Sequence, residues 1–321
     1  MTVAQLAEGI SKGKRRHLAK AITLIESSRE EDQQKAAELL SALPKRNDTL
    51  RLGISGVPGV GKSTFIEAFG NLLIEQGHRV AVLAVDPSSP TTGGSILGDK
   101  TRMELLSGKE EAFIRPSPTA GTLGGVAKKT RESIQLCEAA GYDIVLVETV
   151  GVGQSEFEVA SMVDCFMVLM LPGAGDSLQG IKRGILEITD VMVINKADGD
   201  QKKLAEMAKS EYKNAFHMLA PKYPGMEVAI LTISALQKEG IAEVWEAVNQ
   251  FKEHLTSNNL FDKNRNKQDL NWFKRLVEDE VLHRIWNQAS TQQMVSDLKD
   301  DMLSGKISAT EAARRLMDEI G

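Results

Sequence analysis

Residues 50–64 read LRLGISGVPGVGKST and are followed by FIEAFGNLLIEQG at 65–77. The first six letters form an apolar run of strand length, and the letters after Thr64 repeat apolar residues at helical spacing. Between the two lies the pattern GxxxxGK[ST], from Gly56 to Ser63, in the strand–loop–helix context that the pattern requires. We therefore predict a phosphate-binding loop, in which backbone N–H groups and the start of a helix surround the phosphates of a nucleotide.

Each position of this loop has an expected task. Glycines let the backbone turn inward with no Cβ in the way of the phosphates. The Lys62 ammonium is expected to reach the β- and γ-phosphates, and the Ser63 hydroxyl is expected to bind Mg²⁺. The predicted phosphate contacts are Gly56, Val57, Pro58, Gly59, Val60, Gly61, Lys62, Ser63 and Thr64.

The sequence around this loop predicts an α/β fold. From Leu50 to about Phe251, short apolar runs alternate with helix-length segments; the runs are LRLGIS, VAVLAVD, DIVLVET, CFMVLML, VMVIN and VAILTIS. Strands that are apolar on both faces and separated by helices indicate a mostly parallel, doubly wound sheet covered on both sides. We therefore predict a P-loop NTPase fold, flanked by helical extensions at both ends of the chain.

A second motif points to the base of the nucleotide. The strand VMVI runs into NKAD at 195–198, at the carboxyl end of a strand, where a doubly wound sheet binds its ligands. The Asp198 carboxylate can accept hydrogen bonds from the ring N–H and the exocyclic amino group of guanine, and adenine offers no such pair of donors. Asn195 is expected to tie the base edge to the phosphate loop, and the stem of Lys196 to cover one face of the ring.

A third segment completes the predicted guanine contacts. The strand LTIS ends at Ser234-Ala235-Leu236, where a backbone N–H can reach the guanine carbonyl. A site built to hydrogen-bond one base leaves its own polar groups unpaired with another base. We therefore predict that the chain binds GTP or GDP rather than ATP.

Carboxylates at strand ends are the candidates to hold Mg²⁺ directly or through water. Asp86 ends VAVLAVD, Asp99 lies in the loop that follows, and Glu148 ends DIVLVET. Asp99 suits the cap of a helix before KTRMELL equally well. Glu148 is followed by Gly151, at the position of a γ-phosphate-sensing glycine. The predicted metal ligands are Ser63, Asp86, Asp99 and Glu148.

The segment after Gly151 predicts slow intrinsic hydrolysis. Val152 stands where rapidly responding GTPases carry a water-orienting glutamine, and Gln154 is displaced by two positions. A partner or a second copy is then expected to complete the catalytic arrangement. Three loops are predicted to respond to the γ-phosphate as switches, namely 87–99, 149–157 and 172–183. Three cations are either solvated surface charges or groups that stabilise transition-state charge: Arg102, Lys182 and Arg183.

The regions outside the sheet are predicted to be helical. Residues 1–45 show helical spacing twice and predict two helices, which end before Pro44. After Phe251 we expect a polar linker, LTSNNLFDKNRNKQD, and then helices, the last beginning with a capping box at Ser308 and Glu311. The predicted parts are an N-terminal helical extension (1–46), a P-loop GTPase domain (47–256) and a C-terminal helical dimerisation arm (257–321).

One apolar stripe runs along the predicted arm, formed by Trp272, Phe273, Leu276, Val277, Val281, Ile285 and Trp286. Such a stripe either folds back on the core or pairs with a second copy of the chain. We favour the second possibility and predict a homodimer.

Composition excludes several classes of protein. Among 321 residues, 39 are Lys or Arg and 44 are Asp or Glu, so the net charge of −5 argues against a nucleic-acid-binding surface. The longest apolar stretches, such as 163–171, fall short of the ~20 residues that a membrane span needs. The first residues lack the pattern of a secretory signal, which predicts the cytoplasm, or a matrix reached by a lost presequence. Cys137 and Cys165 are expected to be reduced core thiols.

Four segments together resemble a known family. GVPGVGKST, VDPSSPTTGGSILGDKTRM, ETVGVGQSE and NKAD, in this order and between helical extensions, closely resemble the MeaB/ArgK GTPases, which are bacterial relatives of the human methylmalonic aciduria type A protein. The resemblance covers essentially the whole chain. It implies a homodimeric GTPase chaperone that gates cofactor loading and protects an adenosylcobalamin-dependent acyl-CoA mutase, typically methylmalonyl-CoA mutase.

The resemblance also implies roles for individual residues. It places catalytic and Mg²⁺ roles on Asp86, Asp99 and Glu148, beside the catalytic Lys62, and a partner-sensing third switch near 172–183. Other interpretations stay open: an ATP-dependent kinase linked to amino-acid transport, a metal-insertion GTPase of the hydrogenase or urease maturation type, or a GTP-dependent scaffold with negligible turnover. The client also stays open among methylmalonyl-CoA, ethylmalonyl-CoA and isobutyryl-CoA mutases.

Overall fold

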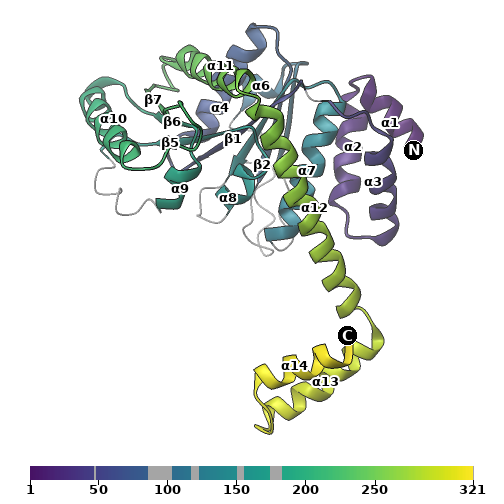
Figure 1. Ribbon diagram of the computed structural model, residues 1–321. Helices are drawn as coiled ribbons and strands as arrows, with labels where there is room; N and C mark the ends of the chain where they lie inside the picture. Colours follow the sequence, from purple (N-terminus) through teal and green to yellow (C-terminus); the bar gives the residue numbers. More distant parts are fainter. Residues whose placement is uncertain (47, 86–102, 117–122, 150–154, 174–182, 321) are drawn as a thin grey trace. The chain divides into compact units, whose positions relative to one another are not determined.

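The computed structural model describes residues 1–46, 48–85, 103–116, 123–149, 155–173 and 183–320 (Figure 1). Its centre is a sheet of seven strands, all parallel, in the order β3-β2-β4-β1-β5-β6-β7. The strands are β1 (Leu50–Gly56), β2 (Val80–Val85), β3 (Ala112–Pro116), β4 (Ile144–Thr149), β5 (Cys165–Met170), β6 (Val191–Ile194) and β7 (Ala229–Thr232). The prediction of a parallel α/β fold is therefore confirmed.

The position of β1 in this sheet determines where a ligand can bind. Strand β1 lies between β4 and β5, with Leu52 beside Leu146 of β4 and Cys165 of β5. The chain builds β2, β3 and β4 on one side of β1 and then crosses to build β5, β6 and β7 on the other. Sheets of this kind bind ligands outside the carboxyl ends of the strands, at the point where the strand order reverses. The loop after β1 occupies that point.

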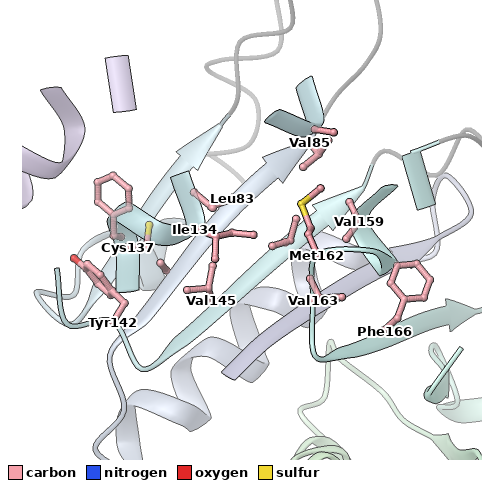
Figure 2. Close-up of a cluster of buried hydrophobic side chains, with 14 of the residues drawn as sticks. Leu83, Val85, Ile134, Cys137, Tyr142, Val145, Val159, Met162, Val163 and Phe166 are labelled. Atoms are coloured by element: carbon pink, nitrogen blue, oxygen red, sulfur yellow. The ribbon is translucent and has the colours of Figure 1, made fainter. Parts of the chain in front are cut away.

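Helices cover both faces of the sheet (Figure 1). Those of the first compact unit are α1 (Val3–Ser11), α2 (Arg15–Glu26), α3 (Glu30–Ala42), α4 (Lys62–Glu75), α6 (Glu104–Ser107), α7 (Leu123–Ala139), α8 (Ser155–Ala160), α9 (Arg183–Ile188), a 3₁₀ turn (Gly199–Gln201), α10 (Lys202–His217) and α11 (Ile241–Ser257). Successive side chains of a strand point to opposite faces. Val145 of β4 accordingly belongs to the core under α7 and α8, whereas Leu146 belongs to the core under α4 and α11. Figure 2 shows part of the first of these cores, with Ile134 of α7 packed near Val145.

The N-terminal extension has three helices rather than the two predicted. The additional helix is α1, which begins with a capping box between Thr2 and Gln5. Apolar residues of all three helices join the core that α7 shares with the sheet. Glu26, at the end of α2, accepts hydrogen bonds from the guanidinium of Arg115 in β3, and its carbonyl accepts one from Lys129 of α7. The extension is therefore held to the edge of the sheet by charge as well as by apolar packing.

Two further sequence predictions were wrong. Strand β3 was missed because AFIRP is short and lies between polar segments. The predicted linker at 255–269 is helical: α11 ends at Ser257, and the next helix, α12, begins at Leu260 after the left-handed residue Asn259 (φ 56°). A single left-handed residue separates two helices without any flexible linker.

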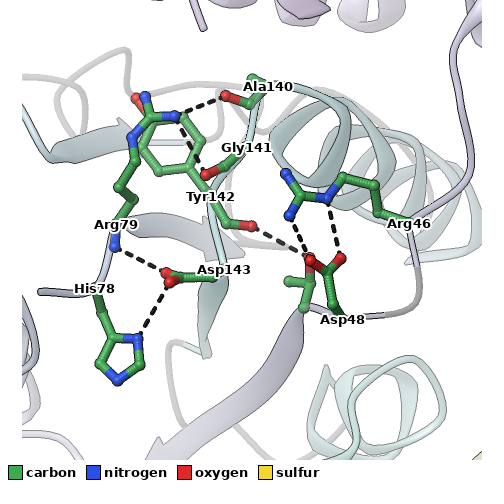
Figure 3. A network of polar contacts seen from close by, with 9 residues as sticks. Arg46, Asp48, His78, Arg79, Ala140, Gly141, Tyr142 and Asp143 are labelled. Atoms are coloured by element: carbon green, nitrogen blue, oxygen red, sulfur yellow. Dashed lines mark hydrogen bonds and ion pairs between the residues drawn. The ribbon is translucent and has the colours of Figure 1, made fainter.

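Side chains close the amino-terminal edge of the sheet (Figure 3). Asp143, just before β4, accepts a hydrogen bond from the backbone N–H of Arg79, just before β2, and lies 3.1 Å from Nδ1 of His78. The Arg79 guanidinium donates to two backbone carbonyls and stacks over the Tyr142 ring, 4.6 Å from its centroid. These contacts fix the starts of two neighbouring strands.

The second compact unit comprises residues 262–321, and the first comprises 1–261. The second unit contains most of α12 (Leu260–Trp286) and a helical hairpin of α13 (Ala289–Leu303) and α14 (Ala309–Ile320). A small core around Leu298 and Leu316 joins the hairpin, and the N–H of Glu311 donates to the Ser308 hydroxyl, as the capping motif predicts. The boundaries predicted between the N-terminal extension, the GTPase domain and the C-terminal arm, at 46/47 and 256/257, stay predictions.

The sequence predicts that no segment spans a membrane and that both cysteines are reduced and buried. No described helix is both long enough and apolar enough to cross a lipid bilayer. Cys137 and Cys165 are both free and fully buried, as predicted. Burial raises the pKa of each thiol, so neither thiolate forms readily at neutral pH.

Candidate functional site

The predicted phosphate loop joins β1 to α4. Strand β1 ends at Gly56 and α4 begins at Lys62, so the loop lies at the carboxyl edge of the sheet, beside the point where the strand order reverses. Gly59 and Gly61 have left-handed backbones, with φ of 76° and 94°. A Cβ on Gly61 would come within 2.7 Å of Nδ2 of Asn195. Glycine is therefore required at 61 by both backbone conformation and space.

The other loop residues surround this turn. Val57, Pro58 and Gly59 form its exposed tip, while Val60 is buried beneath it. Ser63 and Thr64 lie in the first turn of α4, where backbone N–H groups have no partner within the helix. The positive end of the helix dipole adds to these N–H groups, so the loop is suited to binding an anion.

Lys62 lies within the loop that it is expected to serve. Its ammonium donates a hydrogen bond to the Gly56 carbonyl, with 2.8 Å between Nζ and O. Burial lowers the pKa of this lysine, while the negative charges of Glu148 and Glu156 act in the opposite direction. A phosphate would offer the ammonium a stronger, charged acceptor than a neutral carbonyl. In the structure the ammonium therefore has a neutral acceptor, the weaker of the two kinds.

Two carboxylates therefore act on Lys62: that of Glu148, for which the sequence predicts a role, and that of Glu156, for which it does not. Glu148 lies near the end of β4, beside Ile54 of β1, and is 9% exposed. Glu156 lies in the first turn of α8 and is 2% exposed. Glu156 stands in the quoted segment ETVGVGQSE, and its place near the start of a buried helix is the signal that could have identified it. The next residue after Glu148, Thr149, donates a hydrogen bond from its hydroxyl to that of Ser55, which joins the ends of β4 and β1.

Asn195 connects the predicted base-binding segment to the phosphate loop. It is 2% exposed, and its Nδ2 donates to the Val60 carbonyl at 2.8 Å. Its Oδ1 accepts a hydrogen bond from the backbone N–H of Ala235 at 3.0 Å. One side-chain amide therefore holds together three loops that follow β1, β6 and β7.

The remaining residues of the two guanine motifs lie around Asn195. The Asp198 carboxylate accepts a hydrogen bond from the Ser234 hydroxyl, which orients it. Lys196 is exposed and adopts a left-handed backbone (φ 62°), and Leu236 is 75% exposed. The two motifs are 36 residues apart in sequence and adjacent in space. They form a hydrogen-bonded edge that Asn195 connects to the phosphate loop.

Several predicted site residues lie outside the described residues: Asp86, Asp99, Gly151, Val152, Gln154, Arg102 and Lys182. Arg183 begins α9. Within the described part of the chain, no three His, Cys, Asp or Glu side chains are close enough together to hold a metal ion. Two of the four predicted Mg²⁺ ligands, Ser63 and Glu148, are described, and both are hard oxygen donors of the kind that Mg²⁺ prefers.

Comparison with known proteins identifies the family. The family model described as "Methylmalonyl Co-A mutase-associated GTPase MeaB" matches residues 18–290. GTPase ArgK of Escherichia coli is 52% identical over 286 residues, which are 89% of this chain and 86% of that protein. The mitochondrial methylmalonic aciduria type A homolog of Mus musculus is 46% identical over 326 residues, which are 98% of this chain and 79% of that protein.

A solved structure supports the same assignment. The crystal structure of an LAO/AO transport system kinase is 41% identical, with a TM-score of 0.78, and the match covers 99% of this chain and 97% of that one. The phosphate loop and the guanine motifs described above agree with this relationship. The chain therefore belongs to the MeaB/ArgK family of P-loop GTPases.

Proposed function

We propose that this GTPase acts as a chaperone for an adenosylcobalamin-dependent acyl-CoA mutase, with methylmalonyl-CoA mutase as the first candidate. In this proposal it gates loading of the cofactor into the mutase and protects the mutase from inactivation, and it works in the cytoplasm. Membership of a family named for its association with methylmalonyl-CoA mutase carries the proposal. Hydrolysis of GTP to GDP would reset the chaperone after each loading event.

We further propose the nucleotide contacts that the sequence predicted. The loop at 56–64, with Gly151, would hold the phosphates, and Lys62 would exchange the Gly56 carbonyl for the β- and γ-phosphates. Asp198, oriented by Ser234, would accept from the guanine N–H groups, and Asn195 would keep this carboxylate in register with the loop. Ala235 and Leu236 would face the guanine carbonyl, and Lys196 one face of the ring.

Mg²⁺ is the metal expected at this site. Ser63 and Glu148 would hold it together with Asp86 and Asp99, and when bound it would neutralise charge on the β- and γ-phosphates. The carboxylates Glu148 and Glu156, which act on the Lys62 ammonium, supply negative charge close to the loop. Lys62, Asp86, Asp99 and Glu148 are the proposed catalytic residues.

We also propose that the chain forms a homodimer through α12. On this helix Phe273, Val277 and Val281 recur every four residues and are respectively 66%, 44% and 48% exposed. Side chains at this spacing share one helix face, which a second copy could cover. Mass measurement in solution should give twice the chain mass for the natural protein and the chain mass for Phe273→Glu/Val277→Glu. Lys274→Glu on the same helix is the matched control and should stay dimeric.

The decisive experiment compares nucleotide turnover with and without the partner. Phosphate release from GTP and from ATP is measured with Mg²⁺, using the purified chain alone and with methylmalonyl-CoA mutase from the same source. We expect slow turnover of GTP that rises with the mutase, and no turnover of ATP. Ethylmalonyl-CoA and isobutyryl-CoA mutases, used in parallel, would identify the client.

A second measurement tests the chaperone role directly. Transfer of adenosylcobalamin to the apo-mutase, and the rate of mutase inactivation during turnover, are followed with GTP, with GDP and with a non-hydrolysable GTP analogue. We expect both quantities to depend on which nucleotide is bound. Equal values with all three nucleotides would exclude a gating role. ATP turnover would instead favour the kinase interpretation. The solved relative is described as a transport system kinase.

A further inference from the structure

A cavity of about 400 Å³ lies beside α10, at a distance from the nucleotide site (α10 is labelled in Figure 1). Its lining comes from the end of α9 with the residues before β6, the second half of α10, the segment 219–228 that leads into β7, Ile230 of β7 and Phe251 of α11. This volume lies within the range of about 300–1,000 Å³ that small-molecule sites occupy.

The cavity and the nucleotide site lie at opposite edges of the same sheet. Thr189 and Asp190 of the cavity precede β6, whereas Asn195 and Asp198 of the guanine motif follow it. All strands are parallel, and β6 has four residues, which span ~13 Å. The nucleotide contacts proposed above therefore leave the cavity unexplained.

The floor of the cavity is apolar and partly aromatic. Phe251 and Leu186 are buried, and Phe216, Tyr223 and Ile230 are half-buried. Phe251 and Tyr223 pack edge to face, with ring centroids 5.7 Å apart. A ligand that fills this space needs an apolar body of about the size of one or two rings.

One wall of the cavity is basic. Lys209, Lys213 and His217 follow each other every four residues along α10, so they share one helix face, and all three line the cavity. Among the residues that the structure describes, none of these three side chains has a hydrogen-bond or ion-pair partner. A basic wall without internal partners is complementary to an anionic group on a ligand.

Other charges set the limit on how much negative charge the cavity can accept. The Lys222 ammonium donates to both carboxylate oxygens of Asp190, at 2.8 and 2.9 Å, so this pair is internally balanced. Glu187 and Glu227 also line the cavity. These two carboxylates equal Lys209 and Lys213 in number, which disfavours a polyphosphate and restricts a favourable place for one negative charge to the wall formed by α10.

We propose that this cavity is a second ligand site, which binds a small organic monoanion: an apolar, ring-sized body carrying one carboxylate. The body would lie on Phe251, Tyr223 and Ile230, and the carboxylate would face Lys209 and Lys213. The proposal does not depend on the identity of the mutase partner.

Three naphthalene probes of nearly equal size test the role of charge. They are 2-naphthoate, the neutral 2-naphthalenemethanol and the cationic 2-naphthylmethylamine. Binding is measured by calorimetry on the full chain, with the nucleotide site saturated by GDP and Mg²⁺ so that the probes cannot bind there. We expect one bound 2-naphthoate per chain, at least tenfold tighter than the alcohol, and weakest binding of the amine. Equal affinity of acid and alcohol, or tighter binding of the amine, would overturn the proposal.

Two variants locate the site. Lys209→Gln/Lys213→Gln should weaken 2-naphthoate at least tenfold and leave the alcohol unchanged, whereas Val228→Trp should fill the cavity and abolish binding of both. Lys202→Gln/Lys203→Gln removes the same charge from the same helix outside the cavity and is the matched control. Circular dichroism and thermal unfolding verify that each variant is folded. Unchanged binding of 2-naphthoate by either cavity variant, once shown to be folded, would place the probe elsewhere and refute the assignment.

Discussion

The two edges of the central sheet use polar side chains in different ways. At the amino-terminal edge, three aspartates that each precede one strand accept from a backbone N–H in, or just before, a neighbouring strand: Asp143 accepts from Arg79, Asp164 from Arg51 and Asp190 from Phe166. At the carboxyl edge, Asn195 instead connects loops, as through its hydrogen bond to the carbonyl of Val60. The first arrangement anchors strands, and the second positions loops.

The difference shows how one sheet supports both stability and function. Contacts at the amino edge are reinforced by further charge, as where Arg51 makes two hydrogen bonds to the Glu138 carboxylate of α7. Contacts at the carboxyl edge include the hydrogen bond from Lys62 to the Gly56 carbonyl, which we have proposed that a phosphate replaces. We therefore expect changes at the carboxyl edge to affect nucleotide binding and turnover, and changes at the amino edge to affect the free energy of unfolding.

The largest effect is expected for Lys62→Ala. Loss of a charge aimed at the transferred phosphate should lower the rate of GTP hydrolysis by about 10³-fold or more. The free energy of unfolding should change little, because only one hydrogen bond to a loop carbonyl is lost. Turnover is measured by phosphate release and stability by urea unfolding, with Lys35→Ala on α3 as the control. A variant that unfolds instead would contradict the expectation that residues at the carboxyl edge affect turnover rather than stability.

Asp198→Asn should alter the choice of base. Hydrogen bonds to a charged group contribute about 1.5–3 kcal/mol, so the affinity for GTP should fall by about 100-fold. Xanthosine triphosphate, which has a carbonyl in place of the exocyclic amino group, should bind the asparagine variant more tightly than GTP does. Competition against a fluorescent nucleotide measures both affinities. The control is Asp200→Asn, an exposed residue two positions further along. If both variants lose affinity alike, Asp198 has no special role.

At the opposite edge, Asp164→Ala should reduce stability rather than activity. The change leaves the N–H of Arg51 at the start of the sheet without its acceptor, which costs about 1–3 kcal/mol. Asp164→Asn keeps an acceptor oxygen and should cost less. Urea unfolding gives the free energies, and GTP turnover per folded molecule should match that of the natural chain. A fall in turnover without loss of stability would show that the two edges are not separable.

The smallest effect is expected for Asp143→Ala. This carboxylate also caps a strand, but its side chain is 38% exposed, so water can replace part of what is lost. We expect a loss of about 1 kcal/mol, smaller than that of Asp164→Ala. The same unfolding measurement ranks the two variants. An equal or larger loss at position 143 would mean that burial does not control the strength of these caps.

The sequence was informative where a pattern is local. GVPGVGKST and NKAD are short segments in which each residue type has an expected role, and the apolar runs are clearly separated by helix-length segments. The parallel pairing follows from the alternation of strands and helices, whereas the strand order does not. The motifs and the parallel pairing could be predicted because neighbouring residues specify them.

What the sequence could not provide depends on contacts between distant residues. The caps of Asp143, Asp164 and Asp190 join segments 24 to 113 residues apart. Glu156 acquires its relation to Lys62 only when α8 packs beside β4. The cavity beside α10 combines residues from 186 to 251, none of which forms a motif. The start of α12 was missed because polar residues interrupt its apolar spacing. Helix α1 was overlooked although Val3, Leu6 and Ile10 keep helical spacing, so in that case the signal was present in the sequence.

The burial of Cys137 and Cys165 has a practical consequence for work on this chain. Thiol reagents attack the thiolate, and both natural thiols are shielded from solvent and held protonated. A cysteine introduced on the exposed surface of α12 would therefore be the one site that a maleimide dye or a nitroxide label modifies rapidly. Spectroscopic distances between labelled copies could then be followed through a cycle of GTP binding and hydrolysis, in a chain that keeps its natural core.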